Sequence, residues 1–355
     1  MNSRIPARRG GNGLVRVGAG LCVAALALGA WSLPRAETLA GRQVAKKSSL
    51  VPVTITAVPG GLTVIQEYAA EGLGLFRKFG LSVSFDYPTS GTAAAAAIAS
   101  GGVQFYYSTI AEIATLRRNG VDTKAIASLE NDFPGAALYC QKSVSVPVHG
   151  GYKAVFRALK NRTVGVSSIG SLTWELPAYT ELASGLPLGY VKFIAVGSPA
   201  TALAAYESRQ IDCLVTYEPL QYEAARSHVG REVLSWANHQ GPQLYQHYSF
   251  LQLSALDSYI AAHRGVVRDM ARAINAASSI VANPRNAGRV AKAIARYYTG
   301  LSVGVLTTII KDDVASTVGN ALYPRDVRNA EIEAKALGEL KSLVPFSDLV
   351  YPAGG

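Results

Sequence analysis

The segment from Glu67 to Tyr107 most limits the folds open to this chain. It predicts in turn a helix, a strand, a glycine-bearing turn, a helix of small residues and a second strand, in the sequence EYAAEGLGLFRKFGLSVSFDYPTSGTAAAAAIASGGVQFYY. Strands that alternate with helices form βαβ units, which favour a largely parallel sheet covered by helices. The segment therefore predicts half of an α/β lobe.

A helix is expected to begin at Ser90, Gly91 and Thr92, directly after the strand predicted over 81–87. The free N–H groups and the dipole at a helix N-terminus attract anionic or polar ligands, and α/β folds bind ligands at the carboxyl ends of strands. Glycine and serine also fill ordinary turns between strands and helices. The turn is consistent with a binding site and with a plain connection, and both interpretations stay open.

Residues 1–36 are expected to form an export signal. Four arginines lie ahead of an apolar run over 17–30, which is too short for a stable membrane span. Ala30 and Ala36 each put a small residue at a cleavage point, and the choice between them stays open. The segment predicts a periplasmic protein that is secreted through an N-terminal signal peptide.

The net charge of the chain and the spacing of its histidines argue against nucleic-acid binding and against a metal site. Removing residues 1–36 takes away five arginines and no acidic residue, which halves the formal net charge of +10. The remaining basic residues are scattered, so no nucleic-acid-binding surface is predicted. The five histidines show no spacing typical of a zinc site, so we expect no metal and no cofactor.

Cys140 and Cys213 are the two cysteines outside the predicted export signal. Both lie in apolar, strand-like runs, where an unpaired cysteine is usually a small buried hydrophobe. An oxidising compartment permits a disulfide, but the spacing alone does not predict one. The sequence leaves open whether the two are joined.

The rest of the chain predicts two α/β lobes. Proline and glycine residues over 144–151 separate two series of alternating strands and helices, and helix follows helix from about 257 onward. Helices without new strands must pack on a sheet already built, so the C-terminal helices are expected to cover the first lobe. The expected strands are 53–58, 81–87, 103–107, 124–129, 136–140, 163–166, 191–196, 211–216, 232–236 and 248–253, and the expected C-terminal helices are 264–281, 286–298, 303–312 and 326–343.

This order of segments divides the chain into a discontinuous lobe I and a lobe II. Lobe I is expected over 51–136 and 246–345, and lobe II over 137–245, with two chain crossings between them. Strand ends of both lobes would then meet in a cleft, where hinge motion can close the lobes on a ligand.

Several segments carry a family resemblance. They are AAEGLGLFRKFGLSVSF, AAAAAIASGGVQFYYST, LKNRTVGVSSIGSLTWELPAYTELASGL, ALAAYESRQIDCLVTYEP and NPRNA, in that order. Their order resembles the periplasmic solute-binding proteins of ABC importers for nitrate, taurine and other sulfonates, and the related binding proteins for thiamine precursors. The resemblance implies a two-lobe periplasmic binding protein fold of type II, each lobe a mostly parallel sheet flanked by helices, with a C-terminal helical segment packing on lobe I.

Two departures from the family pattern concern the ligand. Cys213 stands where the family commonly has alanine, and the segment 207–209 replaces a glycine-bearing turn. These differences indicate an outlying member whose ligand is not the family's usual one.

The resemblance places the ligand-binding residues where strands end and helices begin. Hydroxyls and helix N-termini from opposite lobes would hold a sulfonate or carboxylate without any arginine. Each serine also suits a helix N-cap, and that interpretation stays open. The implied residues are Gly60, Gly61, Leu62, Ser90, Gly91, Thr92, Ser108 and Thr109 from lobe I, and Ser168, Gly170, Ser171, Leu172, Thr173, Trp174, Tyr217 and Glu218 from lobe II.

Aromatic and acidic residues near these segments leave the ligand class open. Trp174 and Tyr217 would stack on a planar ring, which suits an aromatic acid or a pyrimidine, or they belong to the core. Glu218 would repel a bare anion. Alternatively, it would accept hydrogen bonds from an amine of the ligand, or it would pair with a nearby cation of the protein.

The resemblance implies a substrate-binding component of an ABC importer without catalysis. It would capture a small anionic or heteroaromatic solute, of the sulfonate, nitrate, aromatic carboxylate or pyrimidine type, by hinge closure, and it would act as a monomer that docks on an inner-membrane permease. The alternatives are an enzyme on the same fold, of the desulfinase or pyrimidine-synthesis kind, or a periplasmic ligand sensor. A nucleophilic cysteine needs an exposed, electropositive setting, which the apolar surroundings of Cys140 and Cys213 do not offer.

Overall fold

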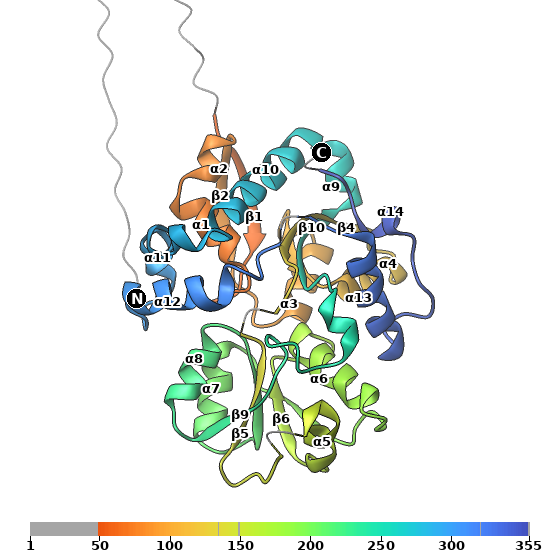
Figure 1. The fold of residues 1–355 in the computed structure, drawn as a ribbon. Helices are drawn as coiled ribbons and strands as arrows, with labels where there is room; N and C mark the ends of the chain where they lie inside the picture. The colour runs from red at the N-terminus through yellow and green to blue at the C-terminus, as the bar shows by residue number, and fades with distance from the viewer. Residues whose placement is uncertain (1–48, 134, 148–149, 320, 354–355) are drawn as a thin grey trace, which may run out of the picture. The chain divides into compact units, whose positions relative to one another are not determined.

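The computed structural model describes residues 49–133, 135–147, 150–319 and 321–353, and the export signal predicted over 1–36 lies outside these ranges. The strands and helices form two groups, and the chain leaves the first group for the second and then returns to the first (Figure 1). We call the group with β1–β4 and β10 lobe I, and the group with β5–β9 lobe II. Within the described ranges, no helix combines the length and apolar character needed to cross a membrane.

Lobe I contains two small sheets. In the first, β1 and β2 pair in parallel, and in the second, β10 lies between β3 and β4 and is antiparallel to both. A bridge between Ile55 and Phe105 brings the first sheet alongside the second. The elements are β1 (Val51–Thr56), α1 (Ile65–Gly72), α2 (Leu75–Lys78), β2 (Leu81–Asp86), α3 (Gly91–Ala99), β3 (Tyr106–Ser108), α4 (Ile110–Arg118), β4 (Thr123–Glu130) and β10 (Leu251–Leu256).

Lobe II contains one five-stranded sheet in the order β7-β6-β8-β5-β9. Helices α5 and α6 lie on one side of its strands and α7 and α8 on the other (Figure 1). Its elements are β5 (Ala137–Gln141), α5 (Gly151–Ala158), β6 (Thr163–Val166), α6 (Leu172–Ala183), β7 (Lys192–Ala195), α7 (Pro199–Glu207), β8 (Cys213–Thr216), α8 (Leu220–Arg226), β9 (Gly230–Ser235) and the 3-10 turn η1 (Gln243–Gln246).

The alternation of strands and helices read from the sequence is confirmed, but the strand directions vary more than the mostly parallel arrangement expected. The β1–β2 sheet is parallel, the β3–β10–β4 sheet is antiparallel, and the sheet of lobe II is mixed. Strands joined by helical crossovers pair in parallel, as β1 does with β2 and as β6 does with β7 and β8. The antiparallel pairs all involve β5 and β10, the strands that the chain reaches when it changes lobes. A strand that enters a sheet without a helical crossover is free of the parallel constraint.

The C-terminal helices pack mainly on lobe I. Helix α10 has the predicted bounds and contacts α1, α2, β2 and β4, with a buried face that repeats at helical spacing through Val267, Met270, Ile274, Ala277 and Val281. The remaining elements are α9 (Asp257–Ala262), α10 (Arg264–Val281), η2 (Pro284–Asn286), α11 (Ala287–Ile294), η3 (Ala295–Tyr297), α12 (Val303–Ile309), the π-turn η4 (Ile310–Val314), α13 (Pro324–Ala336) and α14 (Phe346–Leu349).

Helix α13 differs from its prediction in two ways. It contacts α4 of lobe I and also α6 of lobe II, so the C-terminal segment touches both lobes. It ends at Ala336 although the pattern predicted a helix to 343. Gly338 adopts a φ of 79°, the left-handed conformation that commonly terminates helices and that glycine adopts without strain.

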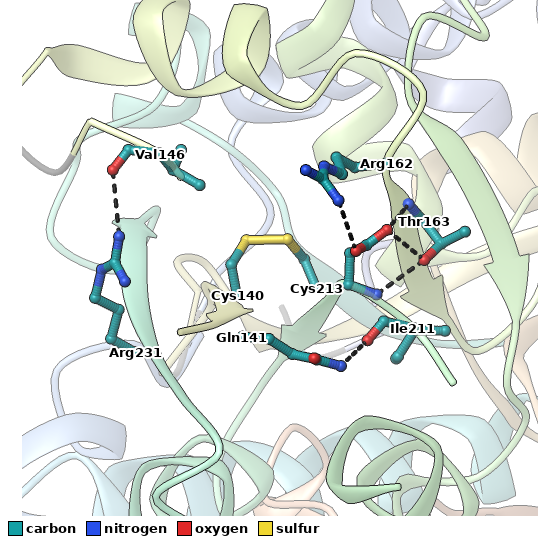
Figure 2. Close-up of a disulfide and its surroundings, with 9 residues drawn as sticks. Cys140, Gln141, Val146, Arg162, Thr163, Ile211, Cys213 and Arg231 are labelled. Atoms are coloured by element: carbon teal, nitrogen blue, oxygen red, sulfur yellow. Dashed lines mark hydrogen bonds and ion pairs between the residues drawn. A yellow bond between two sulfur atoms is a disulfide. The ribbon is translucent and has the colours of Figure 1, made fainter. Parts of the chain in front are cut away.

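A disulfide joins Cys140 to Cys213, which settles the alternative that the sequence left open. The two residues are paired across the antiparallel strands β5 and β8, and both are fully buried. Around the bridge, Gln141 donates a hydrogen bond to the carbonyl of Ile211, and Arg162 lies 3.3 Å from the carboxylate of Asp212 (Figure 2). The bridge thus ties the strand that enters lobe II to the middle of its sheet.

Candidate functional site

A pocket lies between the strand ends of the two lobes. Its empty space is about 920 Å³, which includes solvent at the mouth. The lining comes from segments at which a strand gives way to a turn or a helix, and this is where open α/β sheets bind ligands. These segments are 58–63, 88–91 and 107–112 in lobe I, and 166–173, 196–202 and 214–220 in lobe II, and Leu251 at the start of β10 completes the lining.

Nine of the sixteen residues named from the sequence line this pocket. They share a position at or beside the start of α3, α4, α6 or α8, or in the turn after β1. They are Gly61, Ser90, Gly91, Thr109, Ser171, Leu172, Thr173, Tyr217 and Glu218. The structure therefore gathers these nine around one space, and their contact with a ligand stays a prediction.

Seven residues named from the sequence do not line the pocket. Leu62 and Trp174 belong to the buried core, and the buried hydroxyl of Ser108 lies 2.6 Å from that of Ser254 on β10. Successive strand residues point to opposite faces, so the last residue of β3 faces its neighbour strand while Tyr107 faces the pocket. The others are Gly60 and Gly170, which adopt positive φ, and Thr92 and Ser168.

Three hydrogen bonds connect the lobes beside the pocket. The hydroxyls of Thr92 and Ser168 are 3.2 Å apart, and the amide of Leu62 donates to the carbonyl of Glu218 at 2.9 Å. The hydroxyl of Thr109 donates to Glu175 Oε1 at 3.3 Å. The lobes thus meet through groups that lie in the pocket lining or beside it.

A cluster of hydroxyls marks the start of α6. The side-chain oxygens of Ser167, Ser171 and Thr173 lie within 3.0 Å of one another, and Thr173 also accepts from the amide of Ser167. Across the pocket, Ser90 caps α3 by accepting from the amide of Ala93. These hydroxyls keep lone pairs and rotatable protons for a ligand in addition to their bonds within the turns.

Thr109 and Glu112 form a capping box at the start of α4. The threonine hydroxyl accepts from the amide of Glu112, and Glu112 Oε2 accepts from the amide of Thr109 at 2.9 Å. We expect Thr109→Val to lower the free energy of unfolding by about 1 kcal/mol, because it removes a helix cap and an inter-lobe bond. Urea denaturation followed by circular dichroism measures this loss.

The control for this variant is Thr308→Val on α12. The hydroxyl of Thr308 bonds only to a carbonyl of its own helix, so its loss should change stability by less than about 0.5 kcal/mol. Equal stability losses in the two variants would contradict the role of Thr109 in the capping box.

Glu112 is a buried acid in the pocket wall. Burial raises its pKa to about 8; the hydrogen bond from the Thr109 amide lowers it and the nearby carboxyl of Glu339 raises it. Its Oε1 has no hydrogen-bond partner among the described residues. A Cβ at Gly91 would lie 2.4 Å from this oxygen, so the glycine leaves room for the carboxyl at the start of α3.

Tyr217 and Glu218 form the opposite wall at the end of β8. The peptide bond between Glu218 and Pro219 is cis. Burial raises the pKa of Glu218 to about 8, the charge of Asp313 raises it further, and a bond from the Tyr222 amide lowers it. Within the part of the chain that the structure describes, the Tyr217 hydroxyl and Glu218 Oε2 are buried without a hydrogen-bond partner. Residues with unpaired buried oxygens thus line the pocket from both lobes, Glu112 from lobe I and Tyr217 and Glu218 from lobe II.

The sequence analysis missed three pocket residues that carried a readable signal, Glu112, Ser198 and Pro199. Thr109 and Glu112 fit the capping-box spacing, which marks a helix start and would have drawn attention to the acid. Ser198 followed by Pro199 is typical of a helix N-terminus, and both residues line the pocket at the start of α7. Among the described residues, no group of three acidic, histidine or cysteine side chains is placed to hold a metal ion.

Comparison of the sequence with known protein families identifies the family of this chain. The sequence matches the NMT1-like family over residues 53–295, which include both lobes and the returning strand β10. The chain belongs to the NMT1-like family. No curated protein matches it.

Solved structures share the fold of this NMT1-like protein at low identity. A protein from Bordetella bronchiseptica RB50 has a TM-score of 0.71 at 20% identity, covering 86% of this chain and 95% of its own. The alkanesulfonate-binding protein SsuA from Xanthomonas axonopodis pv. citri, bound to MOPS, has a TM-score of 0.65 at 16% identity, with coverage of 82% and 92%. The periplasmic nitrate-binding protein NrtA from Synechocystis PCC 6803 has a TM-score of 0.63 at 13% identity, with coverage of 86% and 92%. These likenesses confirm the periplasmic binding protein fold.

Proposed function

We propose that this NMT1-like protein is the substrate-binding component of an ABC importer. The observation that carries the proposal is one pocket lined by the helix starts of both lobes. Two of the structurally similar proteins, SsuA and NrtA, are binding proteins for an alkanesulfonate and for nitrate. Most pocket-lining segments end in glycine, serine or threonine turns, which supply hydrogen-bond donors to a small solute.

The proposed mechanism is closure of the lobes on the solute. The lobe boundaries 51–136 with 246–345, and 137–245, belong to this proposal, and the two chain crossings between them serve as the hinge. A ligand that contacts both lobes stabilises the closed state by its differential affinity for it. The inter-lobe bond between Thr92 and Ser168 lies where such closure would be completed.

Among the solute classes expected from the sequence, a heteroaromatic solute fits the pocket better than a bare sulfonate or nitrate. Val166, Leu172, Leu214 and Val215 give the pocket an apolar wall suited to a flat ring. The acids Glu112 and Glu218 would oppose an uncompensated anion.

We further propose a periplasmic, monomeric protein without catalysis, whose partner is an inner-membrane permease. The Cys140–Cys213 disulfide supports an oxidising compartment. It also counts against the desulfinase alternative, since a sulfur held in a disulfide is not the thiolate that such chemistry needs. A periplasmic ligand sensor, the other alternative, would bind a signalling receptor in the membrane in place of a permease.

Analysis of the native solute and of the membrane partner tests the proposal. Protein purified from its own cells is denatured, and the released small molecules are identified by mass spectrometry. The loaded protein is then added to its permease and ATPase reconstituted in liposomes, where we expect it to stimulate ATP hydrolysis. Conversion of the solute by the purified protein, or recovery of a signalling receptor in place of a permease, would refute the importer assignment.

A further inference from the structure

The polar lining of the pocket points to the charge of the solute. Building on the proposed function, we propose that the solute carries a cationic nitrogen group, of the amidinium or ammonium class, on a small apolar body. Glu112 is the residue that binds this group. The inference goes beyond the solute classes expected from the sequence, which were anionic or heteroaromatic.

The first argument is the charge of the lining. Glu112 and Glu218 line the pocket from opposite lobes, and no lysine, arginine or histidine is among the described residues that do so. An anionic ligand would find no cation in this lining to compensate its charge, and it would raise the pKa of both carboxyl groups further. A cationic ligand would instead be attracted by both carboxyl groups.

The second argument is the set of buried oxygens without partners. They are Glu112 Oε1, Glu218 Oε2 and the hydroxyl of Tyr217, and all three residues line the pocket. Less than a tenth of each of these residues is exposed. Unpaired buried polar groups are costly, and a cationic N–H donor both pairs with the carboxyl oxygens and favours their ionised form, in which they are acceptors only.

The third argument is the geometry of Glu112. Its Oε2 is fixed by the Thr109 amide, which leaves Oε1 free to face the start of α3 at Gly91. Helix N-termini usually attract an anion from the ligand. Here the carboxyl group of Glu112 already lies at that position. The ligand group that suits the site is therefore a hydrogen-bond donor to Glu112 Oε1.

The surroundings of Glu112 lead us to expect that it releases a proton when the cationic ligand binds. The titratable groups that face it are acids and phenols, and Arg118 acts only on one of them, Glu339. Burial raises the pKa of Glu112 to about 8, so it holds a proton at neutral pH, and a bound cation would displace that proton. The acids and phenols facing it are Glu175, Glu339, Tyr106 and Tyr107.

Four probes of matched shape and one small anion test the charge of the ligand. Titration calorimetry and thermal shift on the protein lacking residues 1–36 compare benzamidine, neutral benzamide, benzoate, benzenesulfonate and nitrate. We expect benzamidine to raise the melting temperature and to bind about tenfold or more tightly than each of the others, because only it brings charge-assisted donors to the carboxyl group. Tighter binding of either aromatic anion, or no shift with any probe, overturns the inference.

Variants of the pocket test the role of Glu112. Glu112→Gln should keep the capping box, since glutamine serves at that position, and should weaken benzamidine binding about tenfold or more. Gly91→Ala should weaken it as well by displacing the carboxyl group, in case the first variant folds poorly. Glu331→Gln is the matched control, since Glu331 is buried outside the pocket and bonds the Val344 amide.

Proton release separates a binding role of Glu112 from a structural one. At pH 7, calorimetry in buffers of different ionisation enthalpy should show about one proton released per benzamidine by the unaltered protein, and none by Glu112→Gln. Unchanged benzamidine affinity in Glu112→Gln overturns the inference. The importer proposal would survive that result, because its own test uses the native solute and the permease.

Discussion

Replacing both Cys140 and Cys213 by alanine is expected to lower the free energy of unfolding by about 4 kcal/mol. The bridge joins residues that are 73 positions apart, so its removal frees a long loop in the unfolded chain. It also ties β5, the strand that enters lobe II, to β8 at the middle of the sheet. Urea denaturation of the double variant, followed by circular dichroism, gives the loss directly.

Reduction of the unaltered protein supplies the control for this prediction. Dithiothreitol should destabilise the unaltered protein by a similar amount and leave the double alanine variant unchanged, because that variant has no bridge to lose. A stability loss below about 1 kcal/mol would show that the bridge adds little to the packing of β5 against β8 and β9.

Local signals predicted the helices of this protein well. Helix α10 begins and ends where its apolar period and the following Asn283 and Pro284 place it. The end of α13 was misplaced because the pattern was read through Gly338, whose left-handed conformation stops the helix. A signal within a few residues thus fixes a helix boundary, provided that the terminating glycine is recognised.

Strand partners depend on contacts far apart in the sequence and were less predictable. Cys140 and Cys213 face each other only because β5 inserts antiparallel between β8 and β9. The spacing of the two cysteines along the chain does not indicate the strand order β8-β5-β9. For the same reason the antiparallel position of β10 between β3 and β4 could not be derived from the alternation of strands and helices.

The candidate site contains residues that local signals predicted and residues whose position depends on contacts far apart in the sequence. Helix starts such as Ser90 and Ser171 line the pocket as expected, because the end of a parallel strand and the start of the next helix share one edge of the sheet. Ser108 and Trp174 lie in the same segments but point into the core, since orientation depends on strand and helix phase. Glu112 was missed because it lies one turn inside a helix and meets Gly91 only in the folded protein.

Raising the pH from 6 to 9 is expected to lower the free energy of unfolding by several kcal/mol. Burial raises the pKa of Glu112, Glu218 and Glu333 to about 8 and that of Glu339 to about 7, well above the ordinary value of 4.5. Between the two values the folded protein holds protons that the unfolded chain has released. Their contribution is fully present below the unfolded pKa and is lost as the pH rises through 7 to 8, at about 1.4 kcal/mol per pH unit for each retained proton.

Glu333→Gln tests whether these buried acids cause the pH dependence. The carboxyl group of Glu333 accepts hydrogen bonds from Tyr245 and Tyr248, and glutamine replaces it with a neutral group of the same shape. Urea denaturation across the pH range should show a slope for the variant that is flatter by up to about 1.4 kcal/mol per pH unit between pH 6 and 7, with the difference shrinking as the pH passes the folded pKa of about 8. Asp312→Asn, a change at an exposed acid, should leave the slope intact. Stability that stays constant or rises between pH 6 and 9 would mean that these acids are already charged in the folded protein at pH 6.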